Sequence, residues 1–174
     1  MGHNRCLYIT VKYKDFYVTH IMIDGGSGVN IFPISTLKKL NIDVERIRPN
    51  NVCVRAFNGA KSKSIGEIEL MLIIGPIEFT IEFQVLNLES SYNLLLGRPW
   101  IHKAKAVAST LHQMIKIEHN RQEVVIHGEV DLSSYEDSPL SLIKANNVEE
   151  TFVYQTFDTV SVNRIVEGQV ILGP

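Results

Sequence analysis

The sequence predicts an all-β domain, and three observations carry this prediction. From residue 7 to residue 126 the chain is rich in Val, Ile, Phe and Tyr, which are residues that β-strands favour. These residues fall in runs of about five to eight, the length of ordinary strands, separated by Gly, Asn, Pro and Lys. Helical periodicity is confined to two short segments.

Three turn signals divide these runs into hairpins. Lys14-Asp15 and Asn58-Gly59 are polar dipeptides between apolar runs, and Asn-Gly is the strongest hairpin signal of the chain. At Gly75-Pro76, Gly tolerates positive φ and Pro presets its own φ. The strands that flank these turns are expected at residues 7–12, 16–23, 52–57, 65–73 and 77–85.

Two helices and one boundary complete the predicted organisation. Residues 33–40 place Ile34, Leu37 and Leu40 on one helical face, and a second short helix is expected to begin near Arg98. After Gly128 the strand pattern gives way to a polar stretch that is typical of a linker. We therefore predict one domain at residues 5–128, followed by a polar linker and C-terminal tail at residues 129–174 that packs weakly or not at all.

Composition excludes several classes of partner. The chain has 174 residues with 17 Lys and Arg against 19 Asp and Glu, so no basic excess favours nucleic acid. Cys6 and Cys53 are too few for a disulfide scaffold and lack metal-ligand spacing, which favours a reducing compartment. The apolar run at residues 70–74 is far shorter than the roughly 20 residues that span a bilayer. We expect a soluble cytoplasmic protein with no nucleic-acid or membrane partner.

One short segment carries the candidate catalytic chemistry. An apolar run at residues 21–23 leads directly into Asp24-Gly25-Gly26-Ser27-Gly28, so a strand delivers one carboxylate at its end and glycines allow a tight turn. Peptide hydrolysis by carboxylates needs a pair that shares one proton, so that one activates water as a base and the other acts as an acid. The chain has one such segment. A second Asp24 must therefore come from a second copy, and a two-fold homodimer is expected.

Two separated motifs give the chain a family resemblance. The first is Ile23-Asp24-Gly25-Gly26-Ser27-Gly28-Val29-Asn30-Ile31, and the second is Asn93-Leu94-Leu95-Leu96-Gly97-Arg98-Pro99-Trp100. Together with the helical segment 33–40 and Ser109-Thr110-Leu111-His112-Gln113, they resemble the retropepsin-like aspartic protease of plant gypsy-type LTR retrotransposon gag-pol polyproteins. The resemblance covers about residues 5–128 and is more specific than an isolated Asp-Gly-Gly.

The resemblance implies a fold, an activity and a set of supporting residues. The implied fold is a closed, barrel-like single lobe with a flap hairpin, and the implied activity is cofactor-free endopeptidase processing of the element's own polyprotein. Whether this chain is a fragment of such a polyprotein stays open. Leu95, Leu96 and Gly97 would lie beneath the active-site loop, and Arg98 would order that loop or the dimer. The flap would be the hairpin within residues 54–68. Its substrate-binding tip would include Phe57, Asn58, Gly59 and Ala60.

One position departs from the family pattern. Gly25 stands where the resembling proteases have Thr or Ser, whose hydroxyl binds the opposing loop. Loss of one hydrogen bond costs about 0.5–1.5 kcal/mol, so a looser carboxylate pair and a weaker dimer are expected. The hydroxyl of Ser27 is expected to hold the outer carboxylate oxygen of Asp24 instead. The alternative function is therefore a weak or inactive protease-like module that dimerises or binds peptides.

Simpler interpretations stand beside these. Asp24 to Gly28 is by itself also compatible with a solvated turn, and a phosphate loop is disfavoured because no Lys followed by Ser or Thr comes after it. Trp100 and Cys53 are expected to be buried, and residues 61–64 to form a solvated flap. Four late histidines match no zinc-ligand spacing, so no metal is expected: His102, His112, His119 and His127.

Overall fold

A computed structural model describes residues 5–55, 59–130 and 162–164. Within these residues the chain is mostly β-strand, which confirms the all-β prediction. In chain order the elements are β1 (Leu7–Tyr13), β2 (Phe16–Ile23), β3 (Ile31–Pro33), α1 (Ile34–Lys39), the short 3-10 helix η2 (Val44–Arg46), β4 (Cys53–Arg55), β5 (Lys61–Lys63), β6 (Gly66–Ile74), β7 (Ile77–Leu86), β8 (Leu94–Leu96), α2 (Arg98–Ala104), β9 (Val107–Ser109), β10 (Met114–His119), β11 (Gln122–His127) and β12 (Val162–Arg164).

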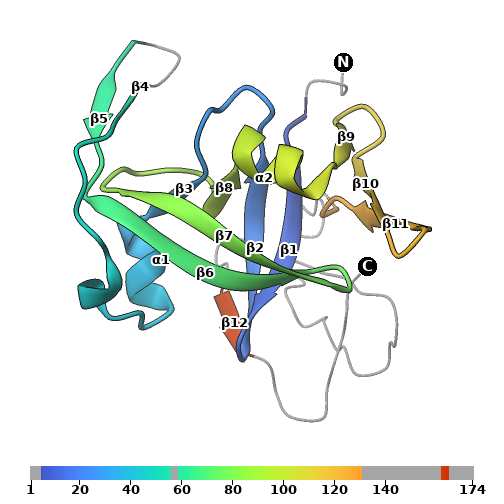
Figure 1. Cartoon of the computed structure of the whole chain (residues 1–174), viewed down its shortest axis with the longest axis horizontal. Helices are drawn as coiled ribbons and strands as arrows, with labels where there is room; N and C mark the ends of the chain where they lie inside the picture. The colour runs from blue at the N-terminus through green and yellow to red at the C-terminus, as the bar shows by residue number, and fades with distance from the viewer. Residues whose placement is uncertain (1–4, 56–58, 131–161, 165–174) are drawn as a thin grey trace.

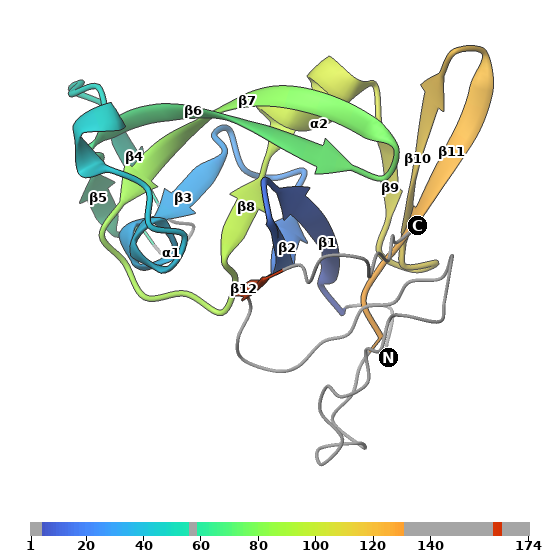
Figure 2. The ribbon, with the colours of Figure 1, turned by 90° about the horizontal axis from the view of Figure 1, so that it is seen from below.

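Six strands close into a barrel (Figure 1). They follow one another in the order β1-β6-β7-β3-β8-β2, and pairing of β1 with β2 completes the ring. Two neighbouring pairs are parallel, β2 with β8 and β3 with β7, and these pairs flank the loop that follows β2. The long β6–β7 hairpin arches across the barrel, and the separate β9–β10–β11 sheet stands beside it (Figure 2). The β4–β5 hairpin projects from the opposite side.

Both predicted helices and two of the three predicted hairpins are present, while the third prediction differs: β4 and β5 pair Arg55 with Lys61, so their connection is longer than the Asn58-Gly59 turn. β1 pairs antiparallel with β2 across Lys14-Asp15, and β6 pairs with β7 across Gly75-Pro76. Lys14 has a φ of 51° and Gly75 a φ of 63°, which is the left-handed backbone that a two-residue hairpin turn uses. Both α-helices begin within one residue of their predicted starts.

The barrel core is made by the alternating inner faces of the strands. Along β6, residues at every second position are buried, as expected for a sheet with one covered face. Trp100 on α2 is 1% exposed and meets the Phe79 ring edge-on at 5.5 Å, which confirms its predicted core position. Full burial of a large apolar side chain stabilises the fold by about 1.5–3 kcal/mol. The largest buried side chains besides Trp100 include Phe32, Phe83, Leu7, Ile9, Ile21 and Leu37.

Some details differ from the sequence expectations. Cys53 is exposed, so the prediction that it is a buried strand residue is wrong: it lies on the face of the short strand β4 opposite to Val54, and Val54 is the partly buried residue of that strand. Glu129, the first residue of the predicted tail, packs against β1 through a backbone hydrogen bond to Tyr8 O. β12, also from that tail, pairs with the first residues of β2. Within the described residues, no helix is long and apolar enough to cross a membrane.

Candidate active site

Asp24 lies directly after β2 and is held by the backbone of β8. Ile23 pairs with Leu96 in the parallel β2–β8 ladder, and the next amide, Asp24 N, donates to Leu96 O at 2.9 Å. Leu95 and Leu96 are buried, so the strand beneath the loop is anchored in the core. The half-buried carboxylate therefore projects from a backbone that is fixed by sheet hydrogen bonds.

The loop after Asp24 folds back onto the carboxylate. Gly26 N donates to Asp24 Oδ1 at 2.8 Å, and Ser27 N donates to Asp24 O at 3.2 Å. A hydrogen bond from a backbone amide to a carboxylate is stronger than one between neutral groups. One carboxylate oxygen is thus oriented by the loop itself, within a single chain.

Gly97 allows the two segments of the site to meet. A Cβ at Gly97 would lie 2.5 Å from Val29 O and 2.6 Å from Ser27 O, distances that real Cβ atoms do not reach. The approach is stabilised by Arg98 N, which donates to Ser27 O at 2.8 Å. Glycine is therefore required at this position for the loop to pack on the β8–α2 connection.

Asn30 is a site residue that the sequence analysis missed. Its side chain is 4% exposed, its Oδ1 accepts from Gly97 N at 2.8 Å, and its Nδ2 donates to Glu82 O at 3.0 Å. It joins the end of the loop to both β7 and the β8–α2 connection. The available signal was a lone amide side chain between the apolar residues Val29 and Ile31, because a polar group placed in a buried run needs a partner.

The side chains of Arg98, from α2, and Ser27, from the loop itself, both bond the loop backbone. The Arg98 guanidinium is exposed, and its Nη1 donates to Gly25 O at 3.3 Å. The Ser27 hydroxyl donates to Val29 O at 2.7 Å and accepts from Val29 N at 3.3 Å. Its single proton is therefore used inside the loop, and the expectation that it holds Asp24 is wrong for the single chain. The cause is local, because a serine hydroxyl readily bonds the backbone two residues later.

Gly25 faces open space. A Cβ added there would have no atom within 4 Å, apart from its chain neighbours, and the residue is exposed. Unlike at Gly97, a larger residue at position 25 would cause no steric clash within the single chain. The loop would accept a side chain at this position without moving.

An apolar surface, which we call the apolar floor, lies beside Asp24. Met22 precedes Asp24 by two residues, so both side chains leave the same face of β2. The floor consists of buried Ile31, Leu86 and Leu95 with partly buried Met22, Val29, Val54, Leu88 and Tyr92. Burial raises the pKa of the Tyr92 phenol, and the negative charge of Asp24 raises it further. Tyr92 is therefore a neutral phenol near the carboxylate at ordinary pH.

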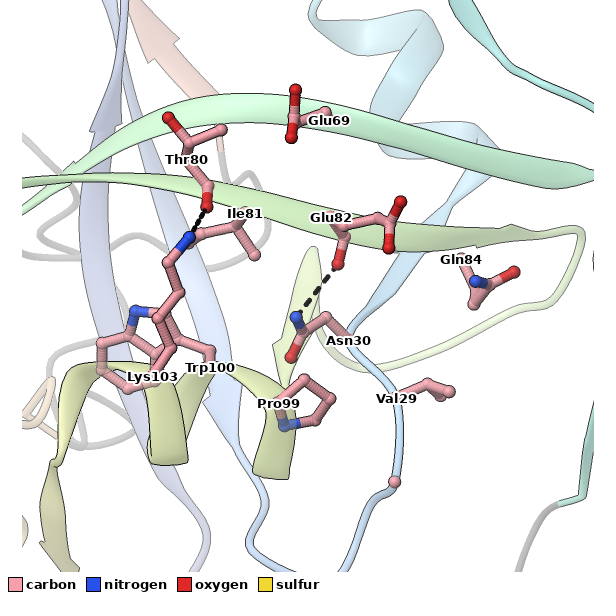
Figure 3. A pocket seen from close by; sticks show the side chains of 11 residues that line it. Val29, Asn30, Glu69, Thr80, Ile81, Glu82, Gln84, Pro99, Trp100 and Lys103 are labelled. Carbon is pink, nitrogen blue, oxygen red and sulfur yellow. Dashed lines mark hydrogen bonds between the residues drawn. The ribbon is translucent and has the colours of Figure 1, made fainter.

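A separate hollow of about 410 Å³ lies between the β6–β7 hairpin, α2 and residues 28–30 of the loop (Figure 3). Its lining includes Asn30, Glu69, Glu82 and Lys103, and Asp24 does not line it. Figure 3 shows the two hydrogen bonds that bridge its walls, from Asn30 to Glu82 O and from Lys103 to Thr80 O. The hollow thus belongs to the support of the loop and not to the carboxylate face.

The structure brings most of the predicted site residues together. Asp24, Gly25 to Gly28, Leu95, Leu96, Gly97 and Arg98 form one cluster around the loop. Gly59 and Ala60 lie exposed in the connection between β4 and β5. Phe57 and Asn58 lie outside the described residues. In the described part of the chain, no group of three or more His, Cys, Asp or Glu side chains could hold a metal ion.

Comparison with known proteins identifies the fold. No protein-family model and no curated protein matches the sequence. The retroviral protease-like domain of Ddi1 from Leishmania major matches the structure with a TM-score of 0.58 and 13% identity, over 74% of this chain and 97% of that one. A retropepsin-like aspartic protease from Rickettsia conorii matches with a TM-score of 0.46 and 21% identity, over 63% of this chain and 82% of that one. On the evidence of the first match and the closed barrel, the chain has the fold of the retropepsin-like aspartic proteases.

Proposed function

We propose that the protein is an aspartic endopeptidase in which two Asp24 residues, one from each chain of a homodimer, activate water. The observation that carries the proposal is the held carboxylate: Asp24 is fixed through Leu96 O, and its Oδ1 is oriented by Gly26 N. Such order, present before any substrate binds, is what a positioned acid or base requires.

The chemistry requires both chains. In the pair, the ionised carboxylate takes a proton from water as the water attacks the scissile carbonyl, and the protonated carboxyl donates to the substrate. The two groups titrate as one unit because they share a proton. A two-fold dimer supplies this arrangement, since the same loop from each chain meets at the axis.

The substrate we propose is an extended polypeptide. The apolar floor continues from Asp24 to Val54 at the base of the β4–β5 hairpin, so apolar side chains of a peptide could pack along it. The motifs around Asp24 and Gly97 further support processing of a retrotransposon-type gag-pol polyprotein. No metal or organic cofactor is needed for this reaction.

A second candidate is a dimerisation or peptide-binding module without turnover. Two observations favour it: Gly25 carries no hydroxyl, and the hydroxyl of Ser27 is used within its own loop. Both would leave the carboxylate pair with fewer hydrogen bonds across the dimer axis. The apolar floor would still bind a peptide.

One experiment separates the two candidates. The purified chain is incubated with a peptide library between about pH 4 and 7. The protease proposal predicts cleavage that Asp24→Asn abolishes and that Asp15→Asn, an exposed control in the β1–β2 turn, retains. Analytical ultracentrifugation of the same samples shows whether Asp24→Asn still dimerises. A chain that stays monomeric at high micromolar concentration, or a dimer that cleaves nothing, would exclude the protease.

A further inference from the structure

The pairing of β1 with β2 contains a bulge at His20, four residues before Asp24. Ile9 pairs with Ile21 and Val11 pairs with Val18, so Thr19 and His20 together oppose the single residue Thr10. His20 has a φ of 57°, an uncommon conformation for a residue other than glycine. Bulges turn a side chain to a new direction and interrupt the ladder. Such backbone strain persists where the surroundings enforce it.

Glu129 fills this bulge from a distant part of the chain. Its Oε2 accepts from His20 N at 2.8 Å and from Thr10 Oγ1 at 2.6 Å, while its Oε1 lies 3.4 Å from His20 Nδ1. Its backbone N donates to Tyr8 O at 2.7 Å. The carboxyl side chain is only 7% exposed. A carboxyl group is thus built into the β1–β2 pair, where it satisfies the amide that the bulge releases.

From the bulge, ring and hydroxyl contacts lead toward Asp24. The His20 ring lies against the Tyr8 ring, with centroids 5.4 Å apart, and Tyr8 Oη is 3.3 Å from Ser91 Oγ. Tyr8 pairs with Met22 across the ladder, so the two side chains share the face that carries Asp24.

The same bulge is tied to the chain segment that carries Tyr92. His20 O accepts from Asn93 N at 2.8 Å, and Thr19 O accepts from Asn93 Nδ2 at 2.6 Å. Tyr92, between Ser91 and Asn93, packs on the apolar floor. The position of this phenol therefore depends on contacts made by both Tyr8 and His20.

We propose that Glu129 is a positioning residue of the active site, which through His20 and Tyr8 sets the Ser91–Tyr92 wall beside Asp24. Glu129 touches neither Asp24 nor the floor, so its effect is on the placement of the wall. The proposal rests on the protease function proposed above. Through the position of the wall, Glu129 would affect how substrate binds, which is a role separate from that of the carboxylate pair.

The arrangement is expected to change with pH because Glu129 gains or loses a proton. Burial raises the pKa of Glu129 to about 7, against the opposing effect of the hydrogen bonds from Thr10 and the His20 amide. The titratable group that faces it is the His20 imidazole from β2, and the Tyr8 ring from β1 contacts that imidazole. Loss of the proton leaves a carboxylate against His20 Nδ1, which favours a proton on that nitrogen and changes the contact of the ring with Tyr8.

The test compares Glu129→Gln, which imitates the protonated form, with wild type. We expect the KM of the wild type for a cleaved peptide to change about two- to threefold between about pH 5.5 and 7, inside the pH range of the cleavage assay, and that of Glu129→Gln to change less over the same range. Glu118→Gln, an exposed control on β10, should follow the wild type. Tyr8→Phe removes only the contact with Ser91 and should also flatten the profile, which keeps the test valid if Glu129→Gln fails to fold.

A second measurement separates this inference from the proposed function. NMR of the ¹³C-labelled tyrosine rings should show the signals of Tyr8 and Tyr92 moving together in the wild type as Glu129 loses its proton, with a midpoint near the Glu129 pKa of about 7, and losing this transition in Glu129→Gln. If the wild type cleaves no peptide while the ring signals follow the proton on Glu129, the protease function fails and the control of the wall by Glu129 stands. If Glu129→Gln keeps the wild-type profile, or if the Tyr92 ring does not respond to Glu129, the inference is overturned.

Discussion

Gly97 and Gly25 offer a matched test of how the active-site loop is built. Both are glycines of the same site, and neither has a φ in the left-handed region. An alanine is therefore acceptable to the backbone at each position, and only the space around the new methyl group differs. At Gly97 that methyl would meet Val29 O at 2.5 Å and Ser27 O at 2.6 Å, whereas at Gly25 it would meet nothing within 4 Å.

The cost of Gly97→Ala follows from this geometry. Moving the two carbonyls out to about 3 Å, the shortest tolerable contact, shifts the loop by about 0.5 Å, and such overpacking costs about 1–3 kcal/mol. The same shift weakens the hydrogen bonds from Arg98 N to Ser27 O and from Gly97 N to Asn30 Oδ1, each worth about 0.5–1.5 kcal/mol. We therefore expect Gly97→Ala to lower the free energy of unfolding by about 2–4 kcal/mol.

Gly25→Ala should behave in the opposite way. It limits the freedom of the unfolded chain without a clash, so the free energy of unfolding should rise by about 0.4–1 kcal/mol. Urea unfolding followed by fluorescence measures both, because Trp100 is the only tryptophan and is buried on α2. The samples are kept dilute so that chain association does not contribute. If the two variants differ by less than about 1 kcal/mol, close to the error of the extrapolation, the argument from close approach is refuted.

Three further variants test other parts of the site. Gly25→Ser should strengthen the dimer by about 1–3 kcal/mol, because each of two new hydroxyls would bond the opposing loop. Sedimentation measures the monomer–dimer equilibrium, and an unchanged equilibrium would contradict this bond. Asn30→Ala removes the partners of Gly97 N and Glu82 O, so calorimetry should find the chain about 2–4 kcal/mol less stable, and a loss under about 1 kcal/mol would contradict the role given to Asn30. Glu129 has a folded pKa of about 7 against an ordinary 4.5, so the folded state holds a proton that the unfolded state releases. Stability should therefore fall as pH rises from about 4.5 to 7, by up to about 3 kcal/mol, and Glu129→Gln should remove this slope in urea titrations at several pH values.

The sequence predicted those features that depend on neighbouring residues. The hairpin turns at Lys14-Asp15 and Gly75-Pro76 carry their own backbone preferences, and the helix at Arg98 has a proline in its first turn. The approach of Gly97 to the loop was expected only from the resemblance, because no local rule pairs residue 23 with residue 96. Local signals thus located the strands, and the motifs located the residues that cluster around Asp24.

Features that depend on distant partners were not predictable. Cys53 lies in a run of apolar residues, but which face of the strand is covered depends on distant partners: Val54 packs on the apolar floor and Cys53 faces away from it. Glu129 begins a polar stretch and was assigned to the tail, yet it is buried because the bulge at His20 provides an amide that needs an acceptor. A bulge arises from the register of two strands, so the residue pattern of either strand alone does not predict it.

The order of the loop within one chain bears on how the dimer would work. Asp24 Oδ1 is bound by Gly26 N, and Ser27 O by Arg98 N, so these bonds exist before a second chain arrives. Association then has little ordering of the loop to offset, which favours binding between preorganised surfaces. The lack of a hydroxyl at Gly25 removes a hydrogen bond between the two loops, and it leaves the hydrogen bonds within each loop unchanged. The weakness expected from this glycine therefore belongs to the monomer–dimer equilibrium, and a carboxylate pair that does form should be close to its working geometry.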